Sequence, residues 1–171
     1  LNPADISYIE TNGTGTALGD PIEVGALGEI FGEELSEANA TPIPLGAVKT
    51  NIGHAEAAAG MAGLIKTVLA IAHQQIPANL HLNQPNTHID WETLPFQLPN
   101  EMLPWHKIEK PPTAGVSAFG FNGTNAHVIV QAAPPSEHSS EDRDKTSENE
   151  QQWLLPLSAR SPAALNQLVA K

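Results

Sequence analysis

A lysine and a histidine five residues apart are the first candidates for acid–base chemistry in this sequence. Lys49 and His54 lie in a polar loop, KTNIGH, that follows the short apolar run 45–48. A histidine in such a loop can donate a ring N–H to a substrate oxygen, and a lysine can supply a positive charge. A capping or surface histidine and a lone buried lysine fit the same spacing, so these residues alone leave both interpretations open.

Two glycine-rich segments could place backbone N–H groups against an anion. The segment GTGTALG, residues 13–19, lacks both the Gly-Lys-Ser/Thr ending of a phosphate loop and the glycine spacing of a dinucleotide-binding turn. A plain tight turn is therefore expected there. The segment SAFGFNGTNAH, residues 117–127, predicts a hairpin. Its Gly- and Asn-rich tip is either a simple turn or a source of N–H donors for an oxyanion.

Composition excludes several other kinds of site. The 171 residues include no cysteine, which excludes disulfides, thiolate metal sites and a cysteine nucleophile within the chain. The seven histidines show no pair at metal-binding spacing, so no metal is expected. With 8 basic against 19 acidic residues the net charge is −11, which argues against nucleic-acid and anionic-membrane partners. The sequence has no apolar run of about 18 residues, so no membrane span is predicted. No signal peptide is visible either, and a cytoplasmic location is expected.

The elements that must position these residues begin with a strand and a helix. Residues 6–9 form a short β-prone run that ends in the glycine-rich turn. A helix is then predicted from Asp20 as the N-cap, with Pro21 at the first helical position and Glu23 completing a capping box. Gly32 is expected to end this helix.

The rest of the pattern predicts a second strand, a second helix and a hairpin. Residues 45–48 indicate a buried strand, and residues 55–75 a helix with one apolar face and a start rich in Ala and Gly. Residues 76–112 have the Pro, Asn and His content of irregular loop. Residues 114–121 and 125–130 predict two hairpin strands. The order βαβα followed by a hairpin favours the α/β class.

A change of composition near residue 133 predicts three parts. Residues 1–133 form the first part, and residues 134–152 hold six acids and two bases with no large apolar side chain. Such a segment cannot offset its ordering entropy, so we expect an acidic disordered linker. Residues 153–171 become apolar again, and Ser161 followed by Pro162 predicts the start of a further helix.

Three long motifs in order resemble one known family. The segments ETNGTGTALGDPIEVGAL, PLGAVKTNIGHAEAAAGMAGLIK and GVSAFGFNGTNAHVIV closely resemble the C-terminal half of the ketosynthase domain of modular polyketide synthases. The later segment LLPLSARSPAAL resembles the stretch that follows such domains. The resemblance implies a thiolase-like fold of α/β/α/β/α layers, of which this chain would supply the C-terminal half, and usually a dimer. It also implies that a partner polypeptide supplies the first half or that the sequence is a fragment of a longer chain.

The resemblance also implies roles for particular residues. In the family, a cysteine of the first half takes an acyl chain from the phosphopantetheine of an acyl carrier protein, and two histidines of the second half assist decarboxylation of the extender. Carried over, His54 matches the second histidine and Lys49 matches the site lysine. The loop Phe119-Gly120-Phe121 matches the one that contributes to the oxyanion hole and gates the pocket. No cofactor is implied for this chain itself.

Two positions depart from the family pattern. Asn12 stands where the first histidine belongs, and asparagine cannot carry a proton or a positive charge. Asn122 stands where glycine is more usual. The sequence therefore resembles the non-elongating ketosynthases, which pass an acyl chain between carrier proteins without extending it. Two alternatives are a silent docking module and a condensing enzyme that tolerates Asn12. The expected partners are a cysteine-bearing half, an acyl carrier protein and a second ketosynthase copy, and this chain alone is expected to be inactive.

Overall fold

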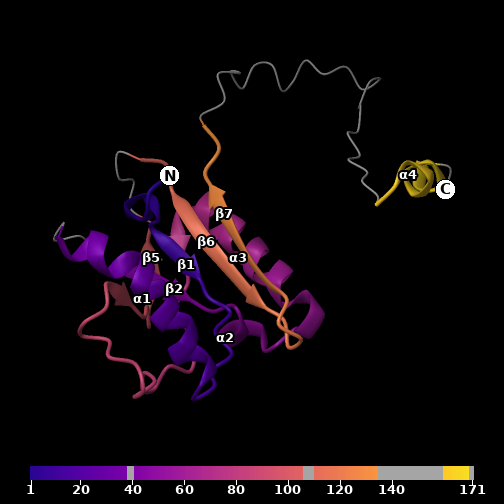
Figure 1. Ribbon diagram of the computed structural model, residues 1–171. Helices are drawn as coiled ribbons and strands as arrows, with labels where there is room; N and C mark the ends of the chain where they lie inside the picture. Colours follow the sequence, from indigo (N-terminus) through magenta and orange to yellow (C-terminus); the bar gives the residue numbers. More distant parts are fainter. Residues whose placement is uncertain (38–40, 106–109, 135–159, 170–171) are drawn as a thin grey trace. The chain divides into compact units, whose positions relative to one another are not determined.

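The computed structural model describes residues 1–37, 41–105, 110–134 and 160–169. It divides the chain into two units, residues 1–134 and residues 135–171. The first unit is built on a five-stranded sheet in the order β4-β2-β1-β6-β7 (Figure 1). The strands are β1 Tyr8–Glu10, β2 Ile43–Gly46, β4 Phe96–Gln97, β6 Thr113–Phe119 and β7 Asn125–Gln131. Strands β4, β2, β1 and β6 run parallel, and β7 returns antiparallel to β6.

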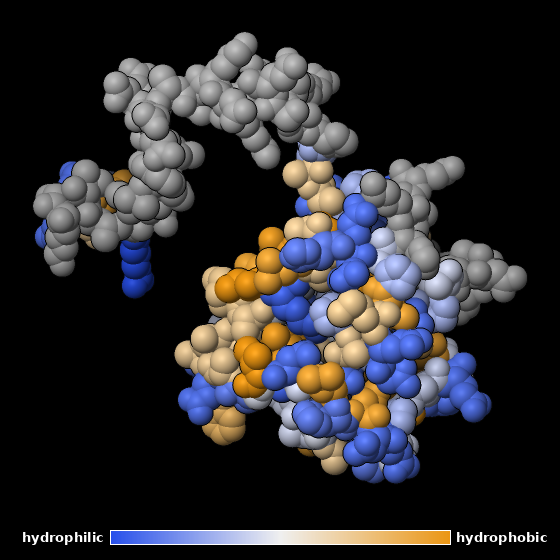
Figure 2. Space-filling view, turned by 180° about the vertical axis from the view of Figure 1, so that it is seen from behind, coloured by the Kyte–Doolittle hydropathy of each residue, from blue (hydrophilic) through white to orange (hydrophobic). Residues whose placement is uncertain are grey.

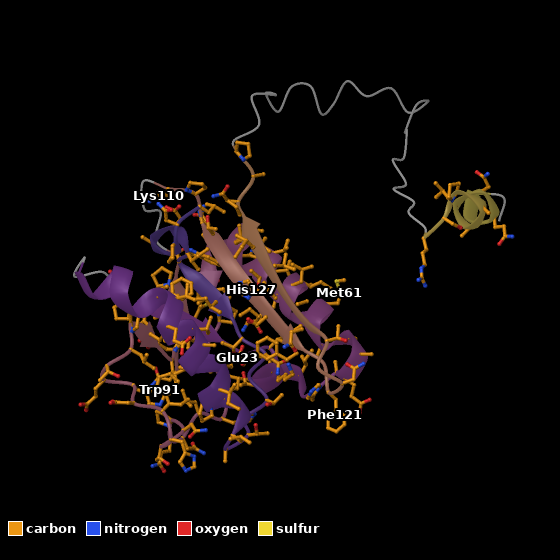
Figure 3. The ribbon with its side chains drawn as sticks, viewed as in Figure 1. Glu23, Met61, Trp91, Lys110, Phe121 and His127 are labelled. Carbon is orange, nitrogen blue, oxygen red and sulfur yellow. The ribbon has the colours of Figure 1, made fainter. Side chains whose placement is uncertain are left out.

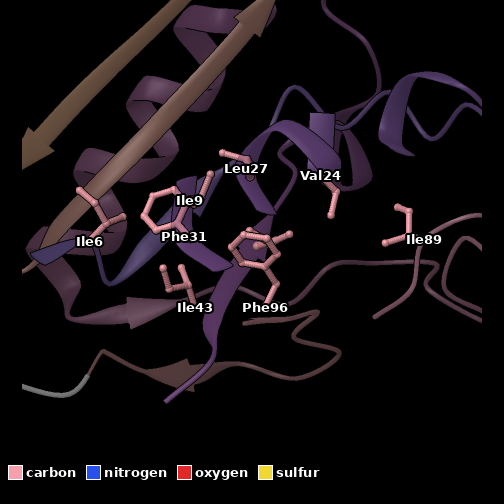
Figure 4. Close-up of a cluster of buried hydrophobic side chains, with 9 residues drawn as sticks. Ile6, Ile9, Val24, Leu27, Phe31, Ile43, Ile89 and Phe96 are labelled. Atoms are coloured by element: carbon pink, nitrogen blue, oxygen red, sulfur yellow. The ribbon is translucent and has the colours of Figure 1, made fainter. Parts of the chain in front are cut away.

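Helix α1, Gly19–Glu37, packs on one face of this sheet. Its apolar side chains meet those of β1, β2 and β4 in one buried cluster, shown in Figure 4. The rings of Phe31 on α1 and Phe96 on β4 meet edge to face, with their centroids 6.1 Å apart. The cluster consists of Ile6, Ile9, Val24, Leu27, Phe31, Ile43, Leu45, Ile89 and Phe96.

Helix α3, Ala59–His73, packs on the other face, against β1 and β6. The 3-10 turn η2, Glu56–Ala58, precedes it. The small residues at its start allow close approach, because a Cβ added at Gly60 would lie 2.9 Å from the Ala118 Cβ. One added at Gly63 would lie 3.1 Å from the Glu10 Cγ. The predicted helix over 55–75 is thus confirmed, and its Ala- and Gly-rich start serves packing on its own sheet.

The α/β order and the hairpin are confirmed, but several boundaries were wrong. The strand predicted over 45–48 lies at Ile43–Gly46 instead. Helix α1 begins at Gly19 and continues past Gly32 to Glu37, so Asp20 does not cap it and Gly32 does not end it. A helical glycine costs only about 1 kcal/mol, which the packing of Phe31 can outweigh. The loop predicted at 49–54 contains a one-turn helix, α2 Lys49–Ile52.

Residues 76–112 are less irregular than predicted. Besides β4 they contribute β5, Leu103–Pro104, which pairs with β3, Gln75–Ile76. Two-residue strands are too short to show an alternating pattern in a sequence. The 3-10 turn η1, Pro3–Asp5, opens the chain.

The second unit contains helix α4, Pro162–Val169. The Ala164 N–H donates to the Ser161 Oγ over 3.3 Å, which confirms Ser161 as the predicted N-cap. The predicted acidic linker falls mostly on residues 135–159, which lie outside the described residues, and its disorder stays a prediction. Across the described ranges, no helix is long and apolar enough to cross a membrane.

Candidate functional site

The turn after β1 carries Asn12, and the carboxylate of Glu23 shapes it from helix α1. The Asn12 N–H donates to Glu23 Oε1 over 2.7 Å, and the Gly13 N–H donates to Glu23 Oε2 over 3.0 Å. Glu23 therefore accepts hydrogen bonds from the Asn12 turn. The predicted capping box, in which Glu23 would bond the start of its own helix, was wrong. Gly13 has a φ of +46°, and a Cβ there would lie 2.7 Å from the Ala47 Cβ, so only glycine fits.

The side chain of Asn12 joins the two other predicted site segments. Its Oδ1 accepts the Phe119 N–H at 3.1 Å and faces the Lys49 Nζ at 3.3 Å. The Lys49 Nζ also donates to the Asn12 main-chain oxygen over 2.5 Å. Both partners of the Asn12 Oδ1 are donors, which fixes the amide with its oxygen toward them. The structure thus brings together Asn12, Lys49 and Phe119, which are far apart in the sequence.

Burial and neighbouring groups shift the pKa values of Lys49 and Glu23 in opposite directions. Burial lowers the pKa of Lys49, while the carboxylates of Glu23, Glu10 and Asp20 act to raise it. Burial raises the pKa of Glu23, against the hydrogen bonds that it accepts from Gly13 and Asn12. The charge of Lys49 and the charges of these three carboxylates therefore influence one another next to the Asn12 turn.

His54 follows Gly53, whose φ of +78° turns the chain between α2 and η2. The Nδ1 atom of His54 accepts the Glu56 N–H over 2.9 Å, so the proton of the neutral ring sits on Nε2. The ring is exposed, which leaves this N–H free to donate to a ligand. Among the residues that the structure describes, no hydrogen bond joins His54 to Asn12 or Lys49.

The hairpin tip presents two exposed aromatic side chains. Phe121 projects fully into solvent at the end of the hairpin (Figure 3), and Phe119 is partly exposed. The Phe119 N–H bonds Asn12, and the Gly120 N–H bonds the Thr124 oxygen over 2.8 Å. Within the described part of the chain the Phe121 and Asn122 N–H groups donate to no protein acceptor, so both are loop donors available to an oxyanion.

Sequence reasoning missed two polar groupings, one buried and one partly buried. One is centred on Glu10, which accepts hydrogen bonds from three different segments. The other is the Ser117 Oγ and His127 Nδ1 pair, 3.0 Å apart at facing positions of the hairpin. Partial burial lowers the pKa of His127 and favours its neutral ring. The facing positions follow from the hairpin register, whereas nothing in the local sequence signals the partners of Glu10.

A cavity of about 600 Å³ lies between the 13–17 turn, the start of α1 and the loop 79–91. Glu23 and Asn79 line it, but both already bond backbone groups. Over the described ranges no group of three or more His, Cys, Asp and Glu side chains could hold a metal.

Helix α3 turns a row of large apolar side chains toward solvent. We call Met61, Ile65, Val68 and Leu69 the α3 apolar face, and each is about half exposed. Two of its members, Ile65 and Leu69, border a groove of about 470 Å³ together with Ile52 and Met102. The view from behind in Figure 2 shows hydrophobic residues at the surface of the first unit. An exposed patch of this kind marks an interaction surface.

Two family models match the chain. One is the beta-ketoacyl synthase C-terminal domain, over residues 1–83, and the other is the ketoacyl-synthetase C-terminal extension, over residues 85–171. The chain is 45% identical over its whole length to erythronolide synthase EryA2 of Saccharopolyspora erythraea, and covers 5% of that protein. It is 47% identical over 98% of its length to polyketide synthase GfsA of Streptomyces halstedii, and covers 2% of that protein.

Solved ketosynthases share the fold. The oxazolomycin ketosynthase domain OzmH KS7 of Streptomyces albus JA3453 is 46% identical with a TM-score of 0.72. The match covers 81% of this chain and 24% of that one. The ketosynthase from module 6 of the bacillaene synthase of Bacillus subtilis 168 is 40% identical with a TM-score of 0.72, over 78% of this chain and 24% of that one. The chain thus spans about a quarter of these solved chains.

Proposed function

This chain belongs to the β-ketoacyl synthase family, as the C-terminal ketosynthase part of a modular polyketide synthase, and we propose that the completed ketosynthase passes acyl chains between carrier proteins without extending them. A cysteine from the other half of the domain takes the acyl group from the phosphopantetheine of an acyl carrier protein. The acyl group then moves from the cysteine to the thiol of a second carrier protein, which frees the cysteine, and no decarboxylative condensation takes place.

The observation that carries this proposal is the environment of Asn12. Decarboxylation of a malonyl-type extender develops negative charge on an enolate oxygen, which aligned donors or a protonated ring must stabilise. The Asn12 Oδ1 is already held by the Phe119 N–H and faces the Lys49 Nζ. An amide fixed in this way has no titratable group, so the neutral Nδ2–H₂ stands in for the donor that a protonated ring would supply. Loss of one aligned donor costs about 10²–10³ in rate.

Acyl loading makes smaller demands on the same residues. Attack of a thiolate on a thioester needs a lowered thiol pKa and donors for one oxyanion. The Phe121 N–H and the His54 Nε2–H are both available as such donors. The groups retained here therefore support transfer better than condensation.

The partners follow from the same proposal. A cysteine-bearing half covers the α3 apolar face, an acyl carrier protein delivers the substrate, and two copies of the domain form a dimer. The chain contains no cysteine, so it forms no acyl-enzyme by itself.

The test uses the completed ketosynthase, acyl carrier protein and malonyl carrier protein, followed by intact-protein mass spectrometry. We expect the acyl chain to appear on the cysteine, with no two-carbon extension. Asn12→His should raise decarboxylation of malonyl carrier protein, while Asn51→His, on the exposed side of α2, should not. Rapid extension with Asn12 in place would instead identify a condensing enzyme, and no loading at all would identify a silent docking module.

A further inference from the structure

A buried carboxylate lies directly beneath the candidate site. Glu10 ends strand β1 and is 1% exposed. It accepts hydrogen bonds from the Val48 N–H at 2.5 Å, the Tyr8 hydroxyl at 2.6 Å and the Lys66 Nζ at 2.8 Å. Burial and the nearby Glu10 carboxylate raise the pKa of Tyr8, so its hydroxyl keeps its proton and donates.

Two glycines make room for this cluster. A Cβ added at Gly46 would lie 1.9 Å from the Tyr8 Oη and 2.9 Å from the Lys66 Nζ. At Gly63 it would lie 3.1 Å from the Glu10 Cγ. The backbone is therefore shaped around the charged group, from β2 on one side and from α3 on the other.

Stability alone does not account for a buried ion pair at this place. Removing two charges from water costs about as much as their attraction returns, and apolar residues of similar volume often serve a core equally well. What distinguishes Glu10 is its connections. Asn12 follows it by two residues, and Val48, whose N–H it holds, directly precedes Lys49. Glu10 is therefore linked to both residues of the Asn12–Lys49 contact. It ends β1 two residues before Asn12, and it binds the N–H of the residue before Lys49.

We infer that Glu10 is a positioning residue, which fixes the start of helix α2 and keeps the Lys49 ammonium charged beside Asn12. The inference rests on the proposed function only in placing Lys49 in the site. Burial lowers the pKa of Lys49, and the carboxylates that act to raise it are Glu23 from α1, then Glu10 from β1 and Asp20 from α1. The Lys66 ammonium from α3 and the Tyr8 hydroxyl from β1 bind Glu10 itself.

The test reads the titration of Lys49 in the completed ketosynthase, labelled with ¹³C and ¹⁵N lysine. The Lys49 signal is identified by its loss in Lys49→Arg. Glu10→Gln keeps the size of the side chain and removes its charge, so the pKa of Lys49 should fall. Tyr8→Phe is the matched control, because it removes a hydrogen bond from the same carboxylate but leaves the charge, and the pKa of Lys49 should stay at its wild-type value.

Two outcomes would overturn the inference. One is an unchanged Lys49 pKa in Glu10→Gln, and the other is an equal fall in Tyr8→Phe, which would assign the effect to packing. If Glu10→Gln fails to fold because Lys66 is left without a counter-charge, the double variant Glu10→Gln, Lys66→Gln is compared with Lys66→Gln alone, and the pKa of Lys49 must be lower in the double variant. Acyl loading by the wild type tests the proposed function separately, since the titration needs no turnover.

Discussion

The site is organised at the residue scale by acids that bond backbone N–H groups. Glu23 holds the Asn12 and Gly13 N–H groups, and Glu10 holds that of Val48. Each carboxylate thus fixes a segment that carries a site residue. The chemistry left to Asn12 and Lys49 depends on these buried neighbours as much as on their own side chains.

Glu23 gives a pH-dependent prediction. Because burial raises its pKa in the folded state, the folded protein holds the Glu23 proton to higher pH than the unfolded chain does. The stability that Glu23 contributes is therefore full below its unfolded pKa and is lost as pH rises through its folded pKa. Glu23→Gln does not titrate, so the thermal midpoint of the wild-type ketosynthase should fall relative to this variant as pH rises above about 4.

The measurement is a pair of thermal unfolding series between about pH 4 and 7, run on the completed domain. Glu29→Gln, an exposed glutamate on the same helix, serves as the control. A difference between wild type and Glu23→Gln that stays constant over this range would contradict the prediction.

Helix α3 is placed at the element scale by glycine contacts with the sheet. Gly60→Ala would set its Cβ 2.9 Å from the Ala118 Cβ, and neither atom can rotate away. Overpacking of this kind costs about 1–3 kcal/mol, against about 1 kcal/mol gained in helix propensity. We expect a lower thermal midpoint for this variant.

Gly25→Ala in helix α1 is its matched control, since a Cβ there meets nothing within 4 Å. This variant should gain the same helix propensity without the overpacking cost, so its thermal midpoint should be unchanged or higher. Equal midpoints for the two variants would show that α3 can move away from β6 at no cost.

The elements that the sequence predicted best are those with long periodic signals. The hairpin over 113–131 and the helix ending at His73 have clear periods, and their structures agree. For the site, the resemblance predicted which residues belong to it but not which of them contact one another. The Asn12–Lys49–Phe119 contact depends on three segments meeting at one end of the sheet, and the role of Glu23 depends on a carboxylate reaching out of its own helix. Such long-range contacts leave no local pattern.

At the scale of the whole molecule, the α3 apolar face distinguishes the first unit from a self-contained domain. The side that faces the sheet is filled by Gly63, Thr67 and Ala70, while Ile65 and Leu69 face solvent. The helix therefore has small, well-packed residues on its sheet side and large apolar ones on its solvent side, and two packed sides are typical of a helix buried between two layers. This matches the proposed cysteine-bearing half, and it predicts how the isolated chain should behave.

We expect the isolated chain to self-associate, and to form a complex with a co-expressed cysteine-bearing half. Leu69→Lys places a charge in the middle of the face, where burying the leucine is worth about 1.5–3 kcal/mol, so it should weaken co-purification by roughly tenfold or more. Ile30→Lys is the control, because Ile30 is a similarly exposed apolar residue on α1 rather than on α3. Size-exclusion chromatography with light scattering gives the mass of each species. If Leu69→Lys and Ile30→Lys weaken the complex equally, or if the wild-type chain is a monomer indifferent to the other half, the α3 apolar face is not the joining surface.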